Sequence, residues 1–361
     1  MAYTAAPMAS EPTPFAAARL RIEAAMARSL ARVPKAVVRR LLSLSRTRHV
    51  VGDHRLDDQV QWADLLRRVA RHRPIEHGSV ANARREYRRM SLLERAPPRM
   101  DEVRDLELEG EHGPIPARMY RPTMGELPLL VYFHGGGGVI GDLETHDVVC
   151  RTFAARSRVV VLAVDYRLAP EHSYLAAAED SFAAYRWCLA HTHALGVRAD
   201  RVAVGGDSRG GKLAAVVCQL AKGRGEPQPR VQLLVYPSTD VAADFPSRTQ
   251  FADAPWLGRD LIRWFERHAL AEPLDRTDPR VSPLRAPDVS GLAPALVVVA
   301  GFDPLRDEGL AYAARLREAG VPVALRDEPT LPHGFLQLTG ISRASAVATD
   351  AIADELRCAL Q

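Results

Sequence analysis

Cysteine and lysine are scarce in this 361-residue sequence. Its 4 cysteines lie far apart and none belongs to a C-x-x-C pair, which argues against a disulfide framework or a zinc ribbon. Nearly all of the 48 basic residues are arginines, because the only lysines are Lys35, Lys212 and Lys222. The arginines are interspersed with acidic residues, so the formal net charge of +4 predicts a solvated surface and no nucleic acid partner.

Long hydrophobic runs are also missing. No stretch approaches the roughly 18 apolar residues of a membrane-spanning helix, so we expect no stable membrane insertion. The alanine-rich start of the chain lacks the uninterrupted apolar core of a secretory signal, because Arg19, Arg21 and Arg28 break it. These absences predict a cytoplasmic protein. The first dozen residues are expected to be disordered, because Pro7, Pro12 and Pro14 lie at this end of the chain.

The composition is that of an ordinary globular protein, with 47% apolar and 25% charged residues. The length allows about two domains, or one large domain with an appendage. Residues 14–98 show only helical periodicity, in segments that begin near Phe15, Val37 and Leu56. The pattern changes after this region, so we divide the chain into an N-terminal helical region, 1–98, and a larger domain, 99–361.

The larger domain alternates predicted strands with predicted helices. Strands are predicted at 103–108, 115–120, 129–133, 159–164, 201–205, 231–236, 295–300 and 321–325. Helices are predicted at 147–156, 175–193, 208–222, 307–318 and 342–359. The later strands are continuous apolar runs, which is typical of parallel strands buried on both faces. The fold class is therefore α/β, with a mostly parallel central sheet of about eight strands and helices on both faces.

Two features stand out at the periphery of this predicted sheet. Residues 240–292 separate two strands by about fifty positions, and an insertion of this length more often contributes a lid than an unstructured loop. The last strand, 321–325, is predicted to lie at the sheet edge. An exposed edge can pair with a second copy, so a homodimer is possible there.

The strongest chemical signal is the segment from Gly206 to Gly211, which contains G-x-S-x-G around Ser208. It follows a predicted strand and opens a predicted helix, the context of a nucleophile elbow. Backbone N–H groups at such a helix start point toward an incoming oxyanion. Taken alone, the pattern fits equally well a glycine-rich helix-start turn that Ser208 caps.

The second signal is His134 followed by four glycines, Gly135 to Gly138, directly after the strand at 129–133. Four consecutive glycines are costly in conformational entropy, so such a loop usually brings bare backbone close to a ligand. Consecutive N–H groups can converge on a negatively charged oxygen. A phosphate-binding loop is the competing interpretation, but the G-x-x-x-x-G-K-[ST] order is missing.

Two further residues follow later strands. Asp303 comes after the strand at 295–300, and His333 follows the last strand after a short loop. Ser208, Asp303 and His333 thus each follow the carboxyl end of a predicted strand, where open α/β sheets build their sites. Asp307 is the alternative acid, although its position at the start of a predicted helix fits an N-cap better.

These motifs together resemble the bacterial hormone-sensitive-lipase-like family of α/β-hydrolase esterases. The resemblance covers most of residues 102–340 and is carried by YFHGGGGVIGDLETHD, VDYRLAPEH, GGDSRGGKLAA, LVYPSTD, DPRVSPL, AGFDPLRDEGLAYAARLREAGV and HGF. It implies an α/β-hydrolase fold with a helical cap, which fits the N-terminal region. It also implies hydrolysis of short-chain carboxylic esters, small-molecule substrates, without a metal or another cofactor.

The resemblance also implies a role for each matching residue. Ser208 matches the nucleophile, His333 the general base and Asp303 the carboxylate that orients the imidazole. The oxyanion hole is expected from the N–H groups of Gly136 and Gly137, with the Arg209 N–H as third donor. His134, Gly135 and Gly138 complete the glycine motif, whereas Asp207 is expected to brace neighbouring loops.

The sequence departs from the family pattern beside the nucleophile. Arg209 stands where the family usually has a small residue, and Gly138 stands where it usually has an aromatic one. A cation at a helix start opposes the helix dipole. Gly138 could leave the space that the Arg209 side chain fills. The alternatives are therefore a weakened or re-purposed α/β-hydrolase, either a ligand-binding protein or an enzyme of amide hydrolysis or acyl transfer.

Overall fold

A computed structural model of the chain describes residues 33, 35–44, 50–51, 54–70, 73–271 and 273–361. Within these residues, eight strands form the central sheet in the order β10-β9-β8-β7-β5-β6-β4-β3. Neighbours from β10 to β6 are parallel, whereas β4 pairs antiparallel with both β6 and β3. Their bounds are β3 Glu102–Leu108, β4 Ile115–Arg121, β5 Leu127–Phe133, β6 Val160–Val164, β7 Val197–Asp207, β8 Gln232–Val235, β9 Ala295–Phe302 and β10 Val323–Pro332.

The central strands of the sheet are buried on both faces, which explains their continuous apolar runs. Along β5, Leu129, Val131 and Phe133 pack into one hydrophobic cluster, while Leu130 and Tyr132 pack into another on the opposite face. Successive side chains of a strand point to opposite faces, so a strand covered on both sides must be apolar throughout. The predicted α/β sheet with two helical layers is confirmed.

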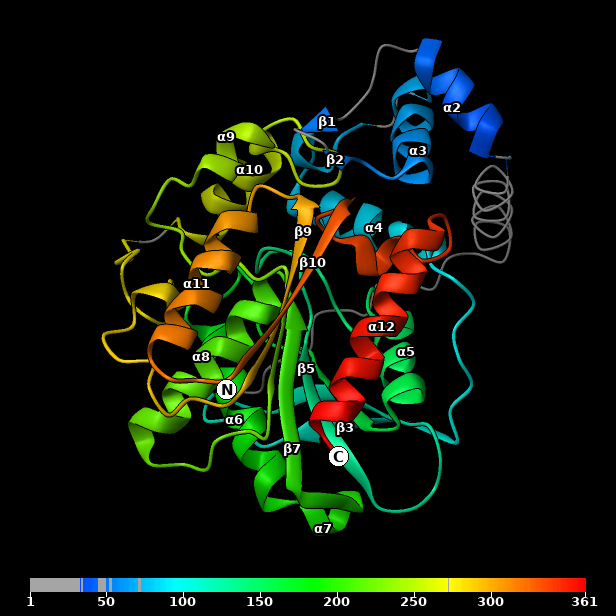
Figure 1. The fold of residues 1–361 in the computed structure, drawn as a ribbon. Helices are drawn as coiled ribbons and strands as arrows, with labels where there is room; N and C mark the ends of the chain where they lie inside the picture. Colours follow the sequence, from blue (N-terminus) through cyan, green and yellow to red (C-terminus); the bar gives the residue numbers. More distant parts are fainter. Residues whose placement is uncertain (1–32, 34, 45–49, 52–53, 71–72, 272) are drawn as a thin grey trace.

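Five long helices form those two layers (Figure 1). The first cluster contains side chains of α6 (Ala176–Ala190), α8 (Arg209–Arg224) and α11 (Arg306–Glu318). The second contains side chains of α5 (Asp147–Ser157) and α12 (Arg343–Ala359). The helix predicted over 175–193 is broken at His191, after which the short α7 (Thr192–Leu195) follows.

The described helices of the N-terminal region, together with α9 and α10 of the 240–292 insertion, lie at the carboxyl ends of the strands, at the top of Figure 1. The N-terminal region contributes α2 (Lys35–Leu44), β1 (Val50–Val51), β2 (His54–Arg55), α3 (Asp58–Val69), η1 (Ile75–His77), α4 (Val80–Met90) and η2 (Ser91–Leu93). The insertion contributes α9 (Pro246–Gln250), α10 (Arg259–Ala269) and η3 (Pro283–Arg285). Ala83 and Tyr87 of α4 pack into one apolar cluster with Leu257, Leu261 and Trp264. This packing joins the two segments.

Two sequence expectations need correction here. The helix α4 was not predicted, because only Ala83 and Tyr87 are buried along its arginine-rich sequence and no apolar periodicity results. The last strand was predicted to end at Leu325, but β10 continues to Pro332, so His333 follows it directly and not after a short loop. Beyond Leu325 the strand contains three charged residues and two prolines, which are rare in strands and hid its extended conformation.

The helix expected near Phe15 and the disordered first dozen residues lie outside the described part of the chain. β10 is at the sheet edge as expected, and the homodimer through it stays a prediction. Across the described ranges, every helix is too short or too polar to cross a bilayer.

Glu94 lies where the N-terminal region joins the core, next to the contact in which Gly340 donates its N–H to the Leu93 carbonyl. Its carboxyl group is buried and neither oxygen has a hydrogen-bond partner. Burial, and then the negative charges of Asp147 and Asp207, raise the pKa of Glu94 well above its ordinary value. The folded protein therefore holds this carboxyl protonated at a pH where the unfolded chain ionises it.

A raised carboxyl pKa makes stability fall as pH rises above the unfolded pKa of about 4.3. We expect the free energy of unfolding of Glu94→Gln, relative to wild type, to increase steadily between pH 5 and pH 8. Urea unfolding followed by circular dichroism measures this difference. Glu126→Gln, at an exposed position, is the control and should show no such trend. A pH-independent difference for Glu94→Gln would mean that Glu94 is ionised in the folded protein.

Candidate active site

The structure brings Ser208, His333 and Asp303 into one hydrogen-bonded line. Ser208 Oγ lies 2.9 Å from His333 Nε2, and His333 Nδ1 lies 2.8 Å from Asp303 Oδ2. The other Asp303 oxygen accepts the Leu305 N–H at 2.8 Å. Three different strand ends, those of β7, β9 and β10, supply these residues. The arrangement arises because parallel strands end at the same edge of the sheet.

The line of hydrogen bonds fixes the imidazole tautomer. A carboxylate only accepts hydrogen bonds, so the Nδ1 of His333 carries the proton that it donates to Asp303. The Nε2 is then free to accept the proton of Ser208 Oγ. Asp303 is fully buried and His333 is almost so, which protects this geometry from competing water.

The backbone of Ser208 is strained in the way that a nucleophile elbow requires. Its φ is +56° and its ψ is −117°, in a region that residues with a side chain rarely adopt. The N–H of Ser208 donates to the Val235 carbonyl at 2.8 Å, which ties the turn to β8. Ser208 precedes α8 but makes no side-chain cap, so the capping interpretation is wrong.

Close backbone packing holds this turn in place. A Cβ atom at Gly210 would lie 1.9 Å from the Phe133 carbonyl oxygen, and one at Gly206 would lie 2.3 Å from it. Real Cβ atoms do not approach an oxygen this closely, so the two glycines are steric requirements. They allow α8 to start directly against the end of β5.

The glycine loop lies on the other side of Ser208. Gly136, Gly137 and Gly138 all have positive φ angles, between +64° and +119°. Gly136, Gly137, Ser208 and Arg209 line one pocket, so the four residues of the expected oxyanion hole and nucleophile face the same space. Arg209 is the first residue of α8, where backbone N–H groups have no partner within the helix.

Beneath the glycine loop, Asp207 links three parts of the fold. Its Oδ1 accepts the Tyr132 hydroxyl at 2.8 Å and the Gly135 N–H at 3.0 Å, and lies 3.3 Å from His146 Nε2. Burial alone would raise the pKa of Asp207, but His146 and Tyr132 hold it below its ordinary value. As expected, Asp207 braces the loops, because it joins the turn at Ser208 to Gly135, the first glycine of the loop.

His134 and three residues that were not identified from the sequence, Tyr87, His146 and Gln337, complete this network. The His134 ring stacks on Tyr166 at 4.3 Å, and burial together with His146 lowers the pKa of His134 to about 4. Gln337 donates to the Tyr87 hydroxyl at 2.7 Å and lies 3.3 Å from His146. No motif links Tyr87, His146 and Gln337, which come from three distant segments.

The sequence indicated Asp307 as the alternative acid and as a helix N-cap, but the structure places it in a different contact. It is the second residue of α11 and not its N-cap, which is Leu305. Its carboxylate accepts the Ser247 N–H at 2.9 Å. Asp307 therefore anchors α9 of the insertion, and Asp303 is the carboxylate that contacts His333.

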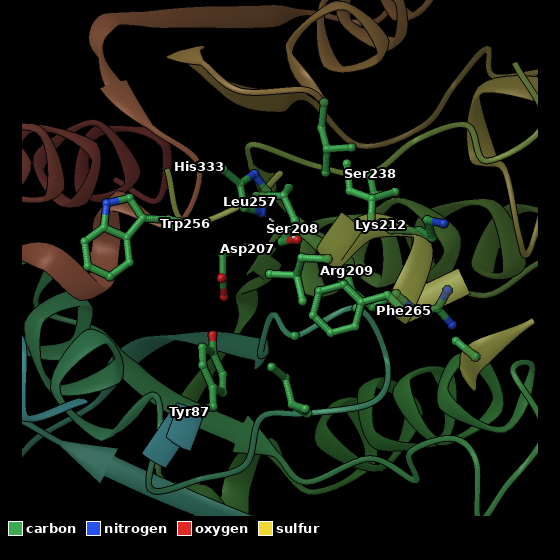
Figure 2. Close-up of a pocket in the computed structure, with 18 of the residues that line it drawn as sticks. Tyr87, Asp207, Ser208, Arg209, Lys212, Ser238, Trp256, Leu257, Phe265 and His333 are labelled. Atoms are coloured by element: carbon green, nitrogen blue, oxygen red, sulfur yellow. Dashed lines mark hydrogen bonds between the residues drawn. The ribbon is translucent and has the colours of Figure 1, made fainter. Parts of the chain in front are cut away.

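The pocket above Ser208 has a volume of about 130 Å³. Figure 2 shows Ser208 and His333 side by side, with Trp256 and Tyr87 on one side and Arg209, Lys212 and Phe265 on the other. The N-terminal region contributes Ile75, Tyr87 and Met90 to the lining. The insertion contributes Val241, Arg248, Trp256, Leu257, Leu261, Ile262, Phe265, Glu266, Ala269 and Leu270. Among the described residues, no group of histidine, cysteine and acidic side chains is arranged to hold a metal.

Arg209, the main departure from the family pattern, points into the protein. Only 2% of it is exposed, and its guanidinium lies 3.5 Å from the centre of the Tyr174 ring. A Cβ at Gly138 would lie 3.6 Å from its Nε, an ordinary contact distance, so the guanidinium lies directly beside Gly138.

Comparisons with known proteins agree with this geometry. A family model described as the alpha/beta hydrolase fold matches residues 130–337. The chain belongs to this family. It is 50% identical over 268 residues to the carboxylic ester hydrolase LipN of Mycobacterium tuberculosis, covering 72% of this chain and 71% of LipN. It is 38% identical over 289 residues to the ethyl acetate hydrolase of Pseudomonas putida, covering 78% and 91% of the two chains.

Solved structures of α/β-hydrolases share the same architecture. The ester hydrolase EH1AB1 from the metagenome of Lake Arreo, solved with a bipyridine phosphonate derivative, superposes with a TM-score of 0.81. It is 42% identical, and the match covers 84% of this chain and 98% of that one. The resemblance stated from the motifs is thus confirmed at the level of the family and its fold.

The requirement for a residue without a Cβ atom at position 210, in the turn at Ser208, can be tested by substitution. Gly210→Ala should destabilise the protein by several kcal/mol, because the new Cβ must displace the Phe133 backbone. Gly223→Ala lies in the same helix with no atom within 4 Å of the new Cβ, and should stabilise by about 0.5–1 kcal/mol. Thermal unfolding of both variants measures the contrast. Equal effects would show that the turn can relax away from β5.

Proposed function

We propose that this chain is a serine carboxylesterase that cleaves short-chain esters through an acyl-enzyme intermediate. The observation that carries the proposal is the unbroken Ser208–His333–Asp303 line at the base of a pocket that also contains Gly136 and Gly137. Relatives named as carboxylic ester hydrolases support ester cleavage as the reaction. A pocket without this line would favour the ligand-binding alternative.

In the proposed mechanism, Ser208 Oγ attacks the ester carbonyl carbon while its proton moves to His333 Nε2. Asp303 stabilises the imidazolium that forms. The N–H groups of Gly136, Gly137 and Arg209 receive the oxyanion of the tetrahedral intermediate. His333 then protonates the leaving alcohol as the C–O bond breaks, which leaves the acyl group on Ser208.

In the second half of the cycle, water hydrolyses the acyl-enzyme, with His333 acting first as base and then as acid. His333 removes a proton from water as the water oxygen attacks the acyl carbon. The second tetrahedral intermediate collapses, the acid is released, and the proton returns from His333 to Ser208 Oγ. Each proton and each bond is accounted for by Ser208, His333 and water, so the proposed reaction requires no cofactor.

The walls of the pocket support a short-chain substrate. A cavity of about 150 Å³ holds a molecule of benzene size, so the 130 Å³ pocket suits an acyl group of only a few carbons. We propose that the N-terminal region, 1–98, acts as a helical cap and that the 240–292 insertion completes this wall. Phe265 of α10 limits the space, because its ring lies where a side chain at Gly137 would be.

The roles of the two carboxylates can be separated by matched variants. Asp303→Asn should lower kcat for p-nitrophenyl butyrate by about three to four orders of magnitude, because an amide cannot hold the required His333 tautomer. Asp307→Asn should keep most of the activity, since Asp307 contacts Ser247. Ser208→Ala should be at least as damaging as Asp303→Asn. A more damaging Asp307→Asn would reassign the acid, and retained activity in Ser208→Ala would remove the proposed nucleophile.

Acyl-chain preference tests the proposed wall. We expect kcat/KM for p-nitrophenyl esters to be highest at chains of about eight carbons or fewer, and to fall beyond that length. Phe265→Ala should move the optimum to longer chains, because it removes a ring from the pocket. Arg259→Ala, an exposed change in the same helix, should leave the optimum where it is. An unchanged optimum in Phe265→Ala would place the acyl chain elsewhere.

A further inference from the structure

Only part of the Arg209 guanidinium has partners in the described part of the protein. Its Nη2 donates to the Tyr174 carbonyl at 3.0 Å, and the guanidinium stacks on the Tyr174 ring. The Nε and Nη1 atoms are buried and have no hydrogen-bond partner. Among the described residues, no carboxylate forms an ion pair with Arg209, and burial lowers its pKa to about 10, so the group remains charged at neutral pH.

Lys212 lies one turn further along α8, on the same face of the helix. It is 1% exposed, and its Nζ lies 2.8 Å from the Tyr174 hydroxyl and 2.8 Å from the Val281 carbonyl. Burial, and then the charge of Arg209, lower the pKa of Lys212 well below its ordinary value. Within the described part of the chain, no acidic side chain comes within ion-pair distance of this amine.

The other charged groups of the pocket do not neutralise the charge of Arg209. Arg248 binds Glu308 at 2.8 Å and also faces Glu266 at 3.7 Å. Asp207 is committed to the network beneath the glycine loop. The pocket therefore contains a local excess of positive charge on the side of Ser208 where Figure 2 shows Arg209 and Lys212.

A buried cation without a counterion is costly, and so is each buried donor without an acceptor. Stacking on Tyr174 offsets part of this cost but leaves two guanidinium nitrogens unpaired. An arrangement of this kind is stabilised when a ligand brings the missing negative charge. Carboxylates bind guanidinium and ammonium groups through short charge-assisted hydrogen bonds.

We propose that Arg209 and Lys212 form a carboxylate-binding subsite, and that the enzyme prefers esters that carry a free carboxylate. This inference rests on the proposed esterase function, whose substrate class it narrows. Arg209 directly follows the proposed nucleophile, and Lys212 lies three residues further along α8, a rise of about 4.5 Å. The carboxylate must therefore lie a short chain away from the ester carbonyl, as in a monoester of a small dicarboxylic acid.

The test compares substrates that differ only in charge. Monoethyl succinate carries the carboxylate on the acyl half, and ethyl 4-oxopentanoate is its neutral analogue with a methyl ketone in place of the carboxylate. O-acetylglycolate carries the carboxylate on the alcohol half, and acetoxyacetone is its neutral analogue. The readout is the ratio of kcat/KM for the charged ester to kcat/KM for its neutral analogue, measured by titration of the released acid.

In wild type we expect this ratio to favour the charged ester for one of the two pairs, which identifies the half that faces Arg209. Arg209→Met and Lys212→Met should each lower that ratio by about tenfold or more, because each removes a charge-assisted hydrogen bond. Arg263→Met, an exposed change in α10, is the control for general electrostatic attraction and should leave the ratio unchanged. Monoethyl glutarate and monoethyl adipate extend the series in chain length.

The outcomes separate this inference from the function on which it rests. If wild type cleaves neither neutral analogue nor any charged ester, the proposed esterase function fails. If it cleaves both members of each pair and the ratios do not change in Arg209→Met and Lys212→Met, the esterase stands and the subsite is overturned. An equal loss of preference in Arg263→Met would also overturn it. Should Arg209→Met not fold, Lys212→Met and the wild-type ratios still decide.

Discussion

The geometry of the site depends on the strained turn at Ser208. A positive φ at a residue with a side chain is unfavourable by about 1–3 kcal/mol, so the surrounding structure has to impose it. Here the Gly210 backbone is pressed against the end of β5, and the Ser208 N–H is bonded to β8. A turn held between two buried strands presents the serine hydroxyl to His333 with little freedom to move away.

The same packing sets the position of the glycine loop. Because Asp207 accepts hydrogen bonds from the N–H of Gly135 and the hydroxyl of Tyr132, the turn at Ser208 and the glycine loop share one buried anchor. Tyr87 extends this anchor to α4 through Gln337. The N-terminal region is therefore connected to the site by polar contacts as well as by apolar packing. We expect substitutions in this region to affect the site, and substitutions in the site to affect this region.

Much of the fold could be predicted from the sequence because it rests on local patterns. Buried parallel strands require apolar side chains on both faces, which made β5 through β9 recognisable. The part of β10 beyond Leu325 could not be predicted, since three charged residues and two prolines at a sheet edge carry no such pattern. For the same reason α4 was missed, although it supplies Tyr87 to the pocket.

The residues of the site also fall into those that the sequence could predict and those that it could not. Ser208, Asp303 and His333 were predictable because each follows a strand and lies in a short motif. His146 and Gln337 were not, because their contacts depend on how distant segments pack. Asp307 could be distinguished from Asp303 only by its bond to Ser247. The orientation of Arg209 likewise depends on Tyr174, 35 residues earlier in the chain.

The measurement that tests the central claim most directly is the reaction with a p-nitrophenyl alkylphosphonate. A serine activated by His333 should displace one equivalent of nitrophenol per chain, with parallel loss of esterase activity. Mass spectrometry of the digested protein should find the phosphonyl group on the peptide that contains Ser208, and Ser208→Ala should not be labelled. A missing nitrophenol burst, or equal labelling of Ser208→Ala, would contradict the assignment of Ser208 as the nucleophile.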